Sequence, residues 1–248
     1  MPTNRRDARL RDQTEIAGMP LRNKILLSIP ETEYRHLSSH LEPFDLVPHE
    51  IIHESSHQLQ FAYFPNCGLI SLVIATEDGK TVEAGMVGSE GVAGVAAAVG
   101  LAISPMRQVV QIAGDALRLK VGHFQNRLKS APHLQLALSR YAVIQGMQVA
   151  QNAACNRLHD VAQRLARWLL MASDRTESNS LSVTHDFLAT ILGTDRPSVS
   201  LAAKALQTRK IIQYSRGILV ILNRKRLEAS ACECYRVIQQ FNGILRLK

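Results

Sequence analysis

The stretch ILGTDRPSVSLAAKALQTRKII, residues 191–212, places a glycine, an aspartate, an arginine and a proline directly before a run with helical periodicity. Gly193 is suited to end one helix, because glycine adopts the left-handed C-cap conformation without a steric penalty. Asp195 can cap the next helix, and Pro197 falls in its first turn, where no amide hydrogen is needed. The stretch therefore predicts two helices joined by a turn of about three residues, the geometry of a helix-turn-helix.

The flanking sequence supports this prediction on both sides. Upstream, SVTHDFLATIL offers Thr184 as an N-cap for the first helix. Each helix carries an apolar face that can pack on the other. These faces consist of Phe187, Leu188, Ile191 and Leu192 on the first helix, and of Val199, Ala202, Ala203 and Leu206 on the second. Downstream, IIQYSRGILVIL predicts two strands joined through Ser215, Arg216 and Gly217, which is typical of the wing of a winged helix.

Basic and hydroxyl side chains surround the predicted second helix. Arginine can bond guanine through two donors, and lysine neutralises the phosphate backbone. We expect Arg196, Ser198, Ser200 and Lys204 on the exposed side of this helix, with Arg209, Lys210 and Arg216 around it. A helical hairpin in an enzyme core is the alternative interpretation, but the wing and the basic charge favour a double-stranded DNA interface.

Charge is distributed unevenly along the 248 residues, whose formal net charge is +8. Residues 1–130 carry 13 Lys and Arg against 14 Asp and Glu, whereas residues 131–248 carry 16 against 7. Only the second part is therefore expected to face a polyanion. The longest apolar and glycine-rich stretch, Gly91 to Ile103, is shorter than the about 20 residues that cross a bilayer, and no signal peptide is recognisable. We expect a cytoplasmic protein.

The first half of the chain has the sequence pattern of β-strands. The segments LVPHEIIH, LQFAYF, LISLVIAT, TVEAGMV and RQVVQIAG are short, apolar or alternating, and separated by turn residues. Between the third and fourth, we expect Asp78 and Gly79 to supply the positive φ angles of a tight hairpin turn. These segments predict an antiparallel sandwich or barrel of roughly a hundred residues. The polar first twenty residues are expected to form a loose arm.

A long helix is predicted after Pro132, because residues 133–174 contain no proline and carry a regular stripe. We expect a bend near residues 158–160. The stripe does not fix whether its packed seam lies within one chain or between two chains. We expect a seam between two chains, because dimers are the commonest oligomers and a helix of this length outgrows a small domain. Its members are Leu134, Leu138, Tyr141, Ile144, Gln148, Gln151, Cys155 and Leu158.

With these features in place, the chain from about Asn23 to Ile238 resembles the Crp/Fnr family of bacterial transcription regulators. The resemblance rests on FPNCGLISLVIATEDGKTVEAGMVG, RLARWLLMASD and LATILGTDRPSVSLAAKALQTRKIIQYSRG. Arg196, Val199 and Ser200 match the family's recognition-helix motif. Leu201 stands where an arginine is usual, and Pro197 where many members have a base-reading glutamate, so the operator sequence of other members does not transfer to this chain.

The resemblance implies an α+β fold with four parts. An arm (1–20) precedes a double-stranded β-roll (21–132), which is jelly-roll-like, resembles cyclic-nucleotide-binding domains and acts as a sensor. A long dimerisation helix (133–159) and a winged helix-turn-helix (160–248) follow. It implies a homodimer that binds a near-palindromic operator, with the two reading helices about one duplex turn apart. It also implies RNA polymerase as a further partner. A signal in the roll would then shift the bend near residues 158–160. A cyclic-nucleotide-binding module that acts through a protein partner is the alternative function.

The resemblance leaves the effector open. Relatives that bind cyclic nucleotides hold the ribose with a Gly-Glu pair and the phosphate with an Arg-Ser or Arg-Thr pair. Here the corresponding positions are Gly88, Glu90, Arg107 and Gln108, with the glutamate displaced and the hydroxyl replaced. Glycines that merely fit tight corners of a vestigial roll are the other interpretation. A cyclic nucleotide is thus a possible cofactor with a degenerate motif.

Other chemistry is not expected from the sequence. No cysteine precedes Cys67, so we expect no iron-sulfur cluster of the family's N-terminal kind. Cys232 and Cys234 are interpreted as semi-buried small residues on a C-terminal helix, with redox or metal chemistry as the alternative. His49, His53 and His57 are interpreted as surface histidines on a strand, and no metal site is expected. Motifs of serine hydrolases, P-loop NTPases and zinc proteases are missing from the sequence, so we expect no enzyme.

Overall fold

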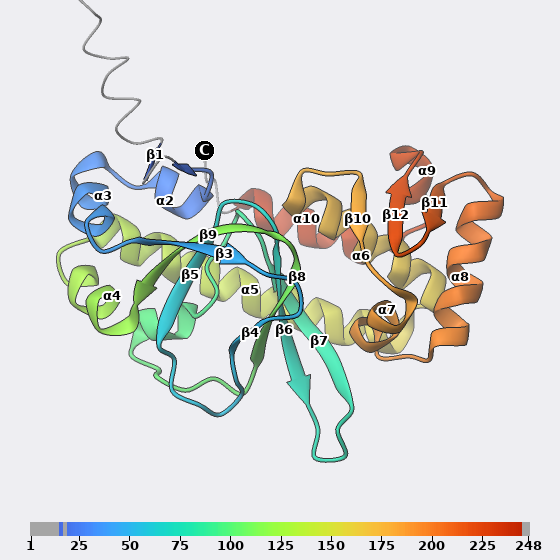
Figure 1. Ribbon diagram of the computed structural model, residues 1–248, viewed down its shortest axis with the longest axis horizontal. Coiled ribbons are helices and arrows are strands. Elements are labelled where there is room, and N and C mark those ends of the chain that lie inside the picture. Colours follow the sequence, from blue (N-terminus) through green and yellow to red (C-terminus); the bar gives the residue numbers. More distant parts are fainter. Residues whose placement is uncertain (1–14, 17–18, 245–248) are drawn as a thin grey trace, which may run out of the picture.

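A computed structural model describes residues 15–16 and 19–244 of the chain. It has the predicted α+β architecture, with a β-roll, a long helix α5 that runs along the roll, and a smaller helical unit with a three-stranded sheet (Figure 1). The predicted loose arm at residues 1–20 falls mostly outside the described residues. Of that segment only two short strands are described, β1 (Glu15–Ile16) and β2 (Met19–Pro20).

The roll consists of two antiparallel sheets that enclose a small apolar core. One sheet has the order β3-β9-β5 and the other the order β4-β8-β6-β7. Their core includes Leu46, Tyr63, Ile70, Val87 and Val110, which are all buried. The strands are β3 (Glu42–Leu46), β4 (Ile51–His53), β5 (Phe61–Pro65), β6 (Leu69–Ala75), β7 (Thr81–Val87), β8 (Arg107–Ile112) and β9 (Gly114–Lys120).

Helices cover the end of the roll. They are α2 (Lys24–Ser28), α3 (Glu31–Ser38), the short 3-10 helix η1 (Val95–Val99) and α4 (Val121–Leu128). A second apolar core joins them to α5 (Pro132–Leu158). The carboxylate of Glu33 accepts hydrogen bonds from the backbone N–H groups of His133 and Leu134, which have no intrahelical partner at the start of α5.

Several local predictions for the roll were wrong in detail. LVPHEIIH is divided between β3 and β4, because His49 turns the chain with a φ of 70°. Only Gly79 has positive φ in the hairpin between β6 and β7, at 80°, whereas Asp78 does not. Strand β9 was not predicted. His53 is buried rather than on the surface, and burial lowers the pKa of its imidazole, whereas His49 and His57 are exposed.

The long helical segment breaks where a bend was predicted. Helix α5 ends at Leu158, and α6 (Val161–Thr176) begins after Asp160, whose side chain accepts from the backbone N–H of Gln163 in a capping box. The stripe predicted as a seam between chains is largely wrong, because six of its eight residues are buried against this chain's own roll and C-terminal segment. Of that stripe Leu158 is 74% exposed, because it lies at the helix end beyond the packed face.

The C-terminal unit has a core of its own that extends into the roll. Its elements are α6, β10 (Ser180–Ser182), α7 (His185–Leu192), α8 (Arg196–Thr208), β11 (Ile212–Ser215), β12 (Ile218–Ile221), α9 (Arg224–Glu228) and α10 (Cys234–Ile244). Strand β10, which was not predicted, completes a sheet of order β10-β12-β11. Leu69 of β6 and Met86 of β7 share this core, so the helix-turn-helix rests on the roll.

Candidate nucleic-acid interface

The helix-turn-helix follows the local signals of the sequence. Thr184 caps α7 by accepting from the backbone N–H of Phe187, and Gly193 ends α7 with a left-handed φ of 56°. Asp195 then caps α8 by accepting from the backbone N–H of Ser198 at 2.8 Å. Hydrogen bonds from Ser198 hold the pKa of the Asp195 carboxyl below its usual value, so this cap is charged at neutral pH.

Helix α8 has a buried and a free face. Val199, Ala202, Ala203 and Leu206 are buried against α6 and α7, as predicted. The opposite face is exposed along its length, and it lies at the edge of the described part of the molecule (Figure 1). Its members are Pro197, Leu201, Lys204, Ala205 and Thr208.

Five of the predicted DNA-binding residues are exposed. Arg196 opens α8 with 65% of its side chain exposed, and its Nε lies 3.5 Å from an oxygen of Asp186. Lys204 lies on the free face, and Arg209 and Lys210 follow the end of α8. Arg216 lies at the tip of the wing, where it and Gly217 have φ values of 50° and 80°. These cations are thus free to meet an anionic partner.

The two predicted serines are only half exposed, which corrects the expectation that they face solvent. Ser198 Oγ donates to the capping carboxylate of Asp195 at 2.9 Å. Ser200 Oγ is hydrogen-bonded to His185 Nδ1 at 2.9 Å, and the His185 ring stacks on Tyr214 at 4.4 Å. Both hydroxyls therefore hold the helix-turn-helix together. Both serines lie in the first turns of α8, where Ser198 faces the cap residue Asp195 and Ser200 faces His185 on α7.

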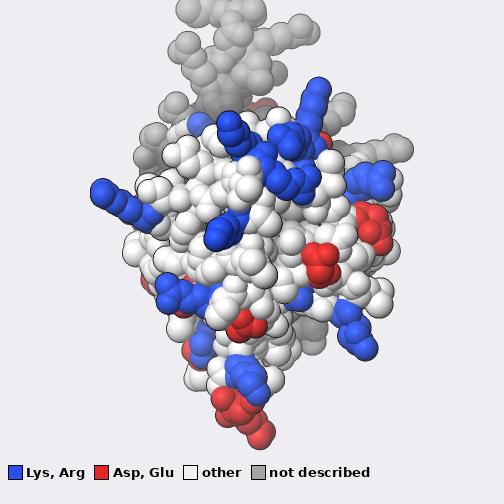
Figure 2. Space-filling model, turned by 90° about the vertical axis from the view of Figure 1, so that its right-hand side faces the viewer, with Lys and Arg blue, Asp and Glu red and all other residues white. Residues whose placement is uncertain are grey.

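Leu201 was noted only as a departure from the family motif, yet it is 71% exposed at the centre of the free face. Leu201 lies three residues before Lys204 and four after Pro197, and residues with this spacing share one face of a helix. This spacing is the sequence signal that could have identified the face. Figure 2 looks onto this side of the molecule and shows Lys and Arg side chains gathered in its upper part, with Asp and Glu side chains to the right and below. The free face of α8 thus combines an apolar residue, Leu201, with the cation Lys204.

The four residues considered for a cyclic nucleotide do not form one site. Glu90 Oε1 accepts from Arg175 Nε at 2.8 Å, in a pair whose side chains are 12% and 3% exposed. Arg107 Nε instead donates to Glu54, at the same distance of 2.8 Å. Gln108 lines a cavity of about 30 Å³, and none of the other three residues lines it. That volume suits about one water molecule, so these residues do not fit a cyclic nucleotide.

The glycines near Glu90 instead allow close packing. A Cβ on Gly88 would lie 2.6 Å from Cβ of Arg175 on α6, and one on Gly91 would lie 2.2 Å from the ring of Tyr141 on α5. Both distances are shorter than real Cβ contacts. The glycine-rich run therefore lets α5 and α6 approach the roll, in line with the second interpretation of these glycines.

Comparisons with known proteins agree with this geometry. Residues 163–230 match the family described as Crp-like helix-turn-helix domain. Among solved structures, FixK2 from Bradyrhizobium japonicum is 15% identical with a TM-score of 0.67, covering 77% of this chain and 98% of that one. The c-di-GMP responsive regulator CLP from Xanthomonas campestris is 15% identical with a TM-score of 0.64, covering 77% and 99%. A CRP-family transcriptional regulator from Thermus thermophilus is 21% identical with a TM-score of 0.61, covering 77% and 96%.

The fold and the interface define a DNA-binding protein of the winged helix-turn-helix class. More particularly, residues 163–230 carry a Crp-like helix-turn-helix domain, the module expected of the DNA-binding transcription regulator that the sequence predicted. A module that acts only through a protein partner is not favoured. No curated protein matches the sequence. Among the helices of the described residues, none combines the length and the apolar character that a membrane crossing requires.

Proposed function

We propose that this regulator binds a near-palindromic DNA operator as a homodimer, with α8 of each chain in consecutive major grooves. The free face of α8, with Arg196 at its start and Lys204 in its middle, is the observation that carries this proposal. Reading helices of a symmetric dimer lie about 34 Å apart along the duplex, which sets the spacing of the two half-sites. The roll (21–132), the dimerisation helix (133–159) and the winged helix (160–248) are the working parts.

Each exposed residue has a distinct role in this proposal. Arg196 reads a guanine, because its guanidinium can donate two hydrogen bonds to one base edge. Lys204, Arg209, Lys210 and Arg216 neutralise phosphates. Ser198 and Ser200 position the helix through their bonds to Asp195 and His185. Leu201 supplies an apolar contact, which suits the methyl group of thymine in the major groove.

The dimer contact uses the outward face of α5. Leu136, Val143 and Met147 are 50%, 59% and 45% exposed there, although all three are apolar. Gly146, Ala150, Ala153 and Ala154 are exposed on the same side and would let two helices approach closely. Their spacing of three and four residues follows one stripe of the helix. This stripe is separate from the one that packs inside the chain.

The remaining partners follow from the same assignment. RNA polymerase is the protein partner, and the cytoplasm is the compartment in which the regulator meets DNA. A signal acts by changing the angle between α5 and α6 at residues 159–160, and thereby the separation of the two α8 helices.

Selection of bound sequences from random duplex DNA tests the proposal. Wild-type protein should enrich an inverted repeat, and Arg196→Ala should lose discrimination of about 1–3 kcal/mol at one position of each half-site. Lys210→Ala should instead weaken binding to all duplexes and lower the salt slope by about one. Lys129→Ala, at the C-cap of α4 at the far end of the roll, is the matched control that should change neither. Uniform loss with Arg196→Ala, or enrichment of no repeat, would contradict the proposal.

A further inference from the structure

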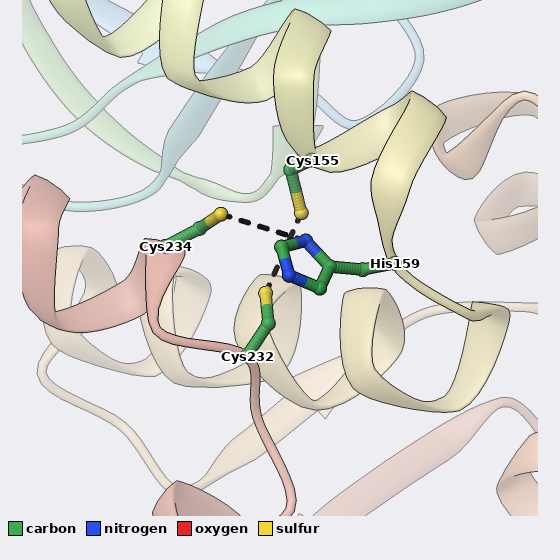
Figure 3. A group of neighbouring side chains, drawn as sticks. All are labelled: Cys155, His159, Cys232 and Cys234. Atoms are coloured by element: carbon green, nitrogen blue, oxygen red, sulfur yellow. Dashed lines mark hydrogen bonds between the residues drawn. The ribbon is translucent and has the colours of Figure 1, made fainter.

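Four potential metal ligands meet where α5 ends, although the sequence gives no sign that they are neighbours. Cys155 lies in the last turn of α5, and His159 is its C-cap residue. Cys232 lies between α9 and α10, and Cys234 opens α10. Their ligand atoms all lie within 4.8 Å of one another (Figure 3). The cluster thus combines an i, i+4 pair from α5 with an i, i+2 pair from the segment that follows the winged helix.

We propose that Cys155, His159, Cys232 and Cys234 form a tetrahedral binding site for a thiophilic divalent metal ion, with Zn²⁺ as the first choice. Three thiolates and one imidazole are a regular zinc ligand set. Zinc-sulfur bonds of about 2.3 Å place the sulfurs of a tetrahedral site about 3.8 Å apart. Here Cys155 Sγ and Cys232 Sγ are 3.5 Å apart, and Cys234 Sγ is 3.7 Å from His159 Nδ1. Shifts of about an ångström would complete the coordination.

The surroundings of the histidine also fit a metal ligand. Its Nδ1 faces the thiol of Cys234, whereas its Nε2 lies 3.2 Å from a carboxylate oxygen of Glu233. Metal-bound histidines regularly donate their second ring N–H to a carboxylate, which fixes the tautomer and the ring orientation. Gln151 Nε2 donates to Cys234 Sγ at 3.1 Å, as an amide beside a metal thiolate does. The site therefore has outer partners on α5 and directly before α10.

Burial and charge favour metal binding at this place. All three cysteines are buried, and His159 has only 14% of its side chain exposed. Zinc with three thiolates and a neutral imidazole carries a net charge of −1, and the buried guanidiniums of Arg164 and Arg167 on α6 carry positive charge nearby. The negative charge of the loaded site is thus offset by neighbouring cations.

A Cys155–Cys232 disulfide is the competing use of this cluster. It would employ two of the four groups and leave the Cys234 thiol and the His159 imidazole facing each other without a role. The convergence of all four groups, with a carboxylate behind the imidazole, favours a metal ion. The site would clamp the end of α5 to the start of α10, next to the break between α5 and α6. Metal binding itself does not depend on the proposed DNA-binding function.

Cobalt uptake by the full chain tests the site. Protein purified anaerobically with a non-thiol reductant is stripped with a chelator and titrated with Co²⁺. One equivalent should bind, with the visible bands of tetrahedral Co²⁺ and near-ultraviolet thiolate-to-cobalt charge transfer, and Zn²⁺ should displace it. Cys232→Ser should abolish the charge-transfer signature or reduce affinity at least about tenfold. Cys67→Ser is the matched control, because this cysteine is hydrogen-bonded to Asp115 in the roll, and it should bind as the wild type does.

A second variant guards against a loss of fold in the cysteine variants. The Glu233 side chain is 62% exposed, so Glu233→Gln should fold normally yet lower metal affinity by about tenfold, because the imidazole loses its carboxylate partner. No tetrahedral Co²⁺ signature in the reduced wild-type protein would overturn the site. Equal loss of affinity in Cys67→Ser would also overturn it. A reversible Cys155–Cys232 disulfide in a protein that takes up no metal would assign the cluster to redox chemistry instead.

Discussion

Glu83 gives the sharpest prediction, because its carboxyl is buried where the winged-helix unit rests on the roll. Its Oε1 accepts from Trp168 Nε1 at 3.0 Å, and its other oxygen accepts from Ser71 Oγ. Burial raises the pKa of Glu83 from 4.5 to about 7, although the cations Arg167 and Arg175 lower it in part. At pH 6 the folded protein therefore holds a proton on Glu83 that the unfolded chain has released.

The sign of the effect follows from this difference in bound protons. Below pH 4.5 both states are protonated, and the raised pKa has no effect on stability. As the pH rises from 4.5 to about 7, the unfolded state loses the proton first, so the free energy of unfolding falls. At about 1.4 kcal/mol for each pH unit, the total loss is about 3 kcal/mol.

Glu83→Gln should remove this loss. The amide oxygen can accept from Trp168 and the amide nitrogen can donate to Ser71, so the packing is retained. Urea unfolding from pH 4 to pH 8 measures the free energy of unfolding of both proteins. The titration of His53 and His185 cancels in the difference, because both proteins contain these histidines. The variant should gain about 3 kcal/mol relative to wild type across this range. Parallel pH profiles for the two proteins would refute the assignment of a protonated Glu83.

Three further changes test other parts of the molecule. Leu201→Ser should reduce preference for thymine at one position of each half-site in selected duplexes while leaving the salt slope unchanged, because only the apolar contact is lost. Val143→Glu should lower the dimer affinity measured by sedimentation at least about tenfold, because the new charge in the α5 stripe must be desolvated when the dimer forms. Lys129→Glu, outside this stripe, should leave the dimer affinity unchanged. Leu188→Ala, at a fully buried position, should lower the free energy of unfolding in urea by about 2–5 kcal/mol.

The helix-turn-helix could be predicted from the sequence because its signals are local. Thr184, Gly193 and Asp195 each act within three or four residues of their own position, and the structure uses each one as a cap. The apolar faces of α7 and α8 follow from periodicity alone. Which strand pairs with which is a longer-range property. Strand β10 was missed because SLS is too short to show a pattern, and β9 because the alternation in GDALRLK is confined to its last four residues.

Residues that meet across the chain were harder to predict. The inward face of α5 mixes Leu138 and Tyr141 with Gln148, and the sequence could not indicate whether this face meets the roll or a second chain. Glu90 was interpreted as a possible ribose ligand because its partner, Arg175, lies 85 residues further along. The cysteine cluster was missed for the same reason: 77 residues separate Cys155 from Cys232, so the sequence does not show that the two pairs meet.

These long-range contacts concentrate on α6, which begins directly after the break at residues 159–160. Trp168 donates to Glu83, Arg175 donates to Glu90, and Arg167 Nη1 donates to Asn152 Oδ1 at 2.6 Å, so α6 is tied to both the roll and α5. Leaving a buried guanidinium or carboxylate without its partner is strongly destabilising. A change in the angle between α5 and α6 therefore requires new partners for these groups, and intermediate angles are disfavoured. We therefore expect two discrete arrangements of the reading helices. A signal would choose between them by acting on the contacts between α6 and the roll, rather than by binding in the roll's small cavity.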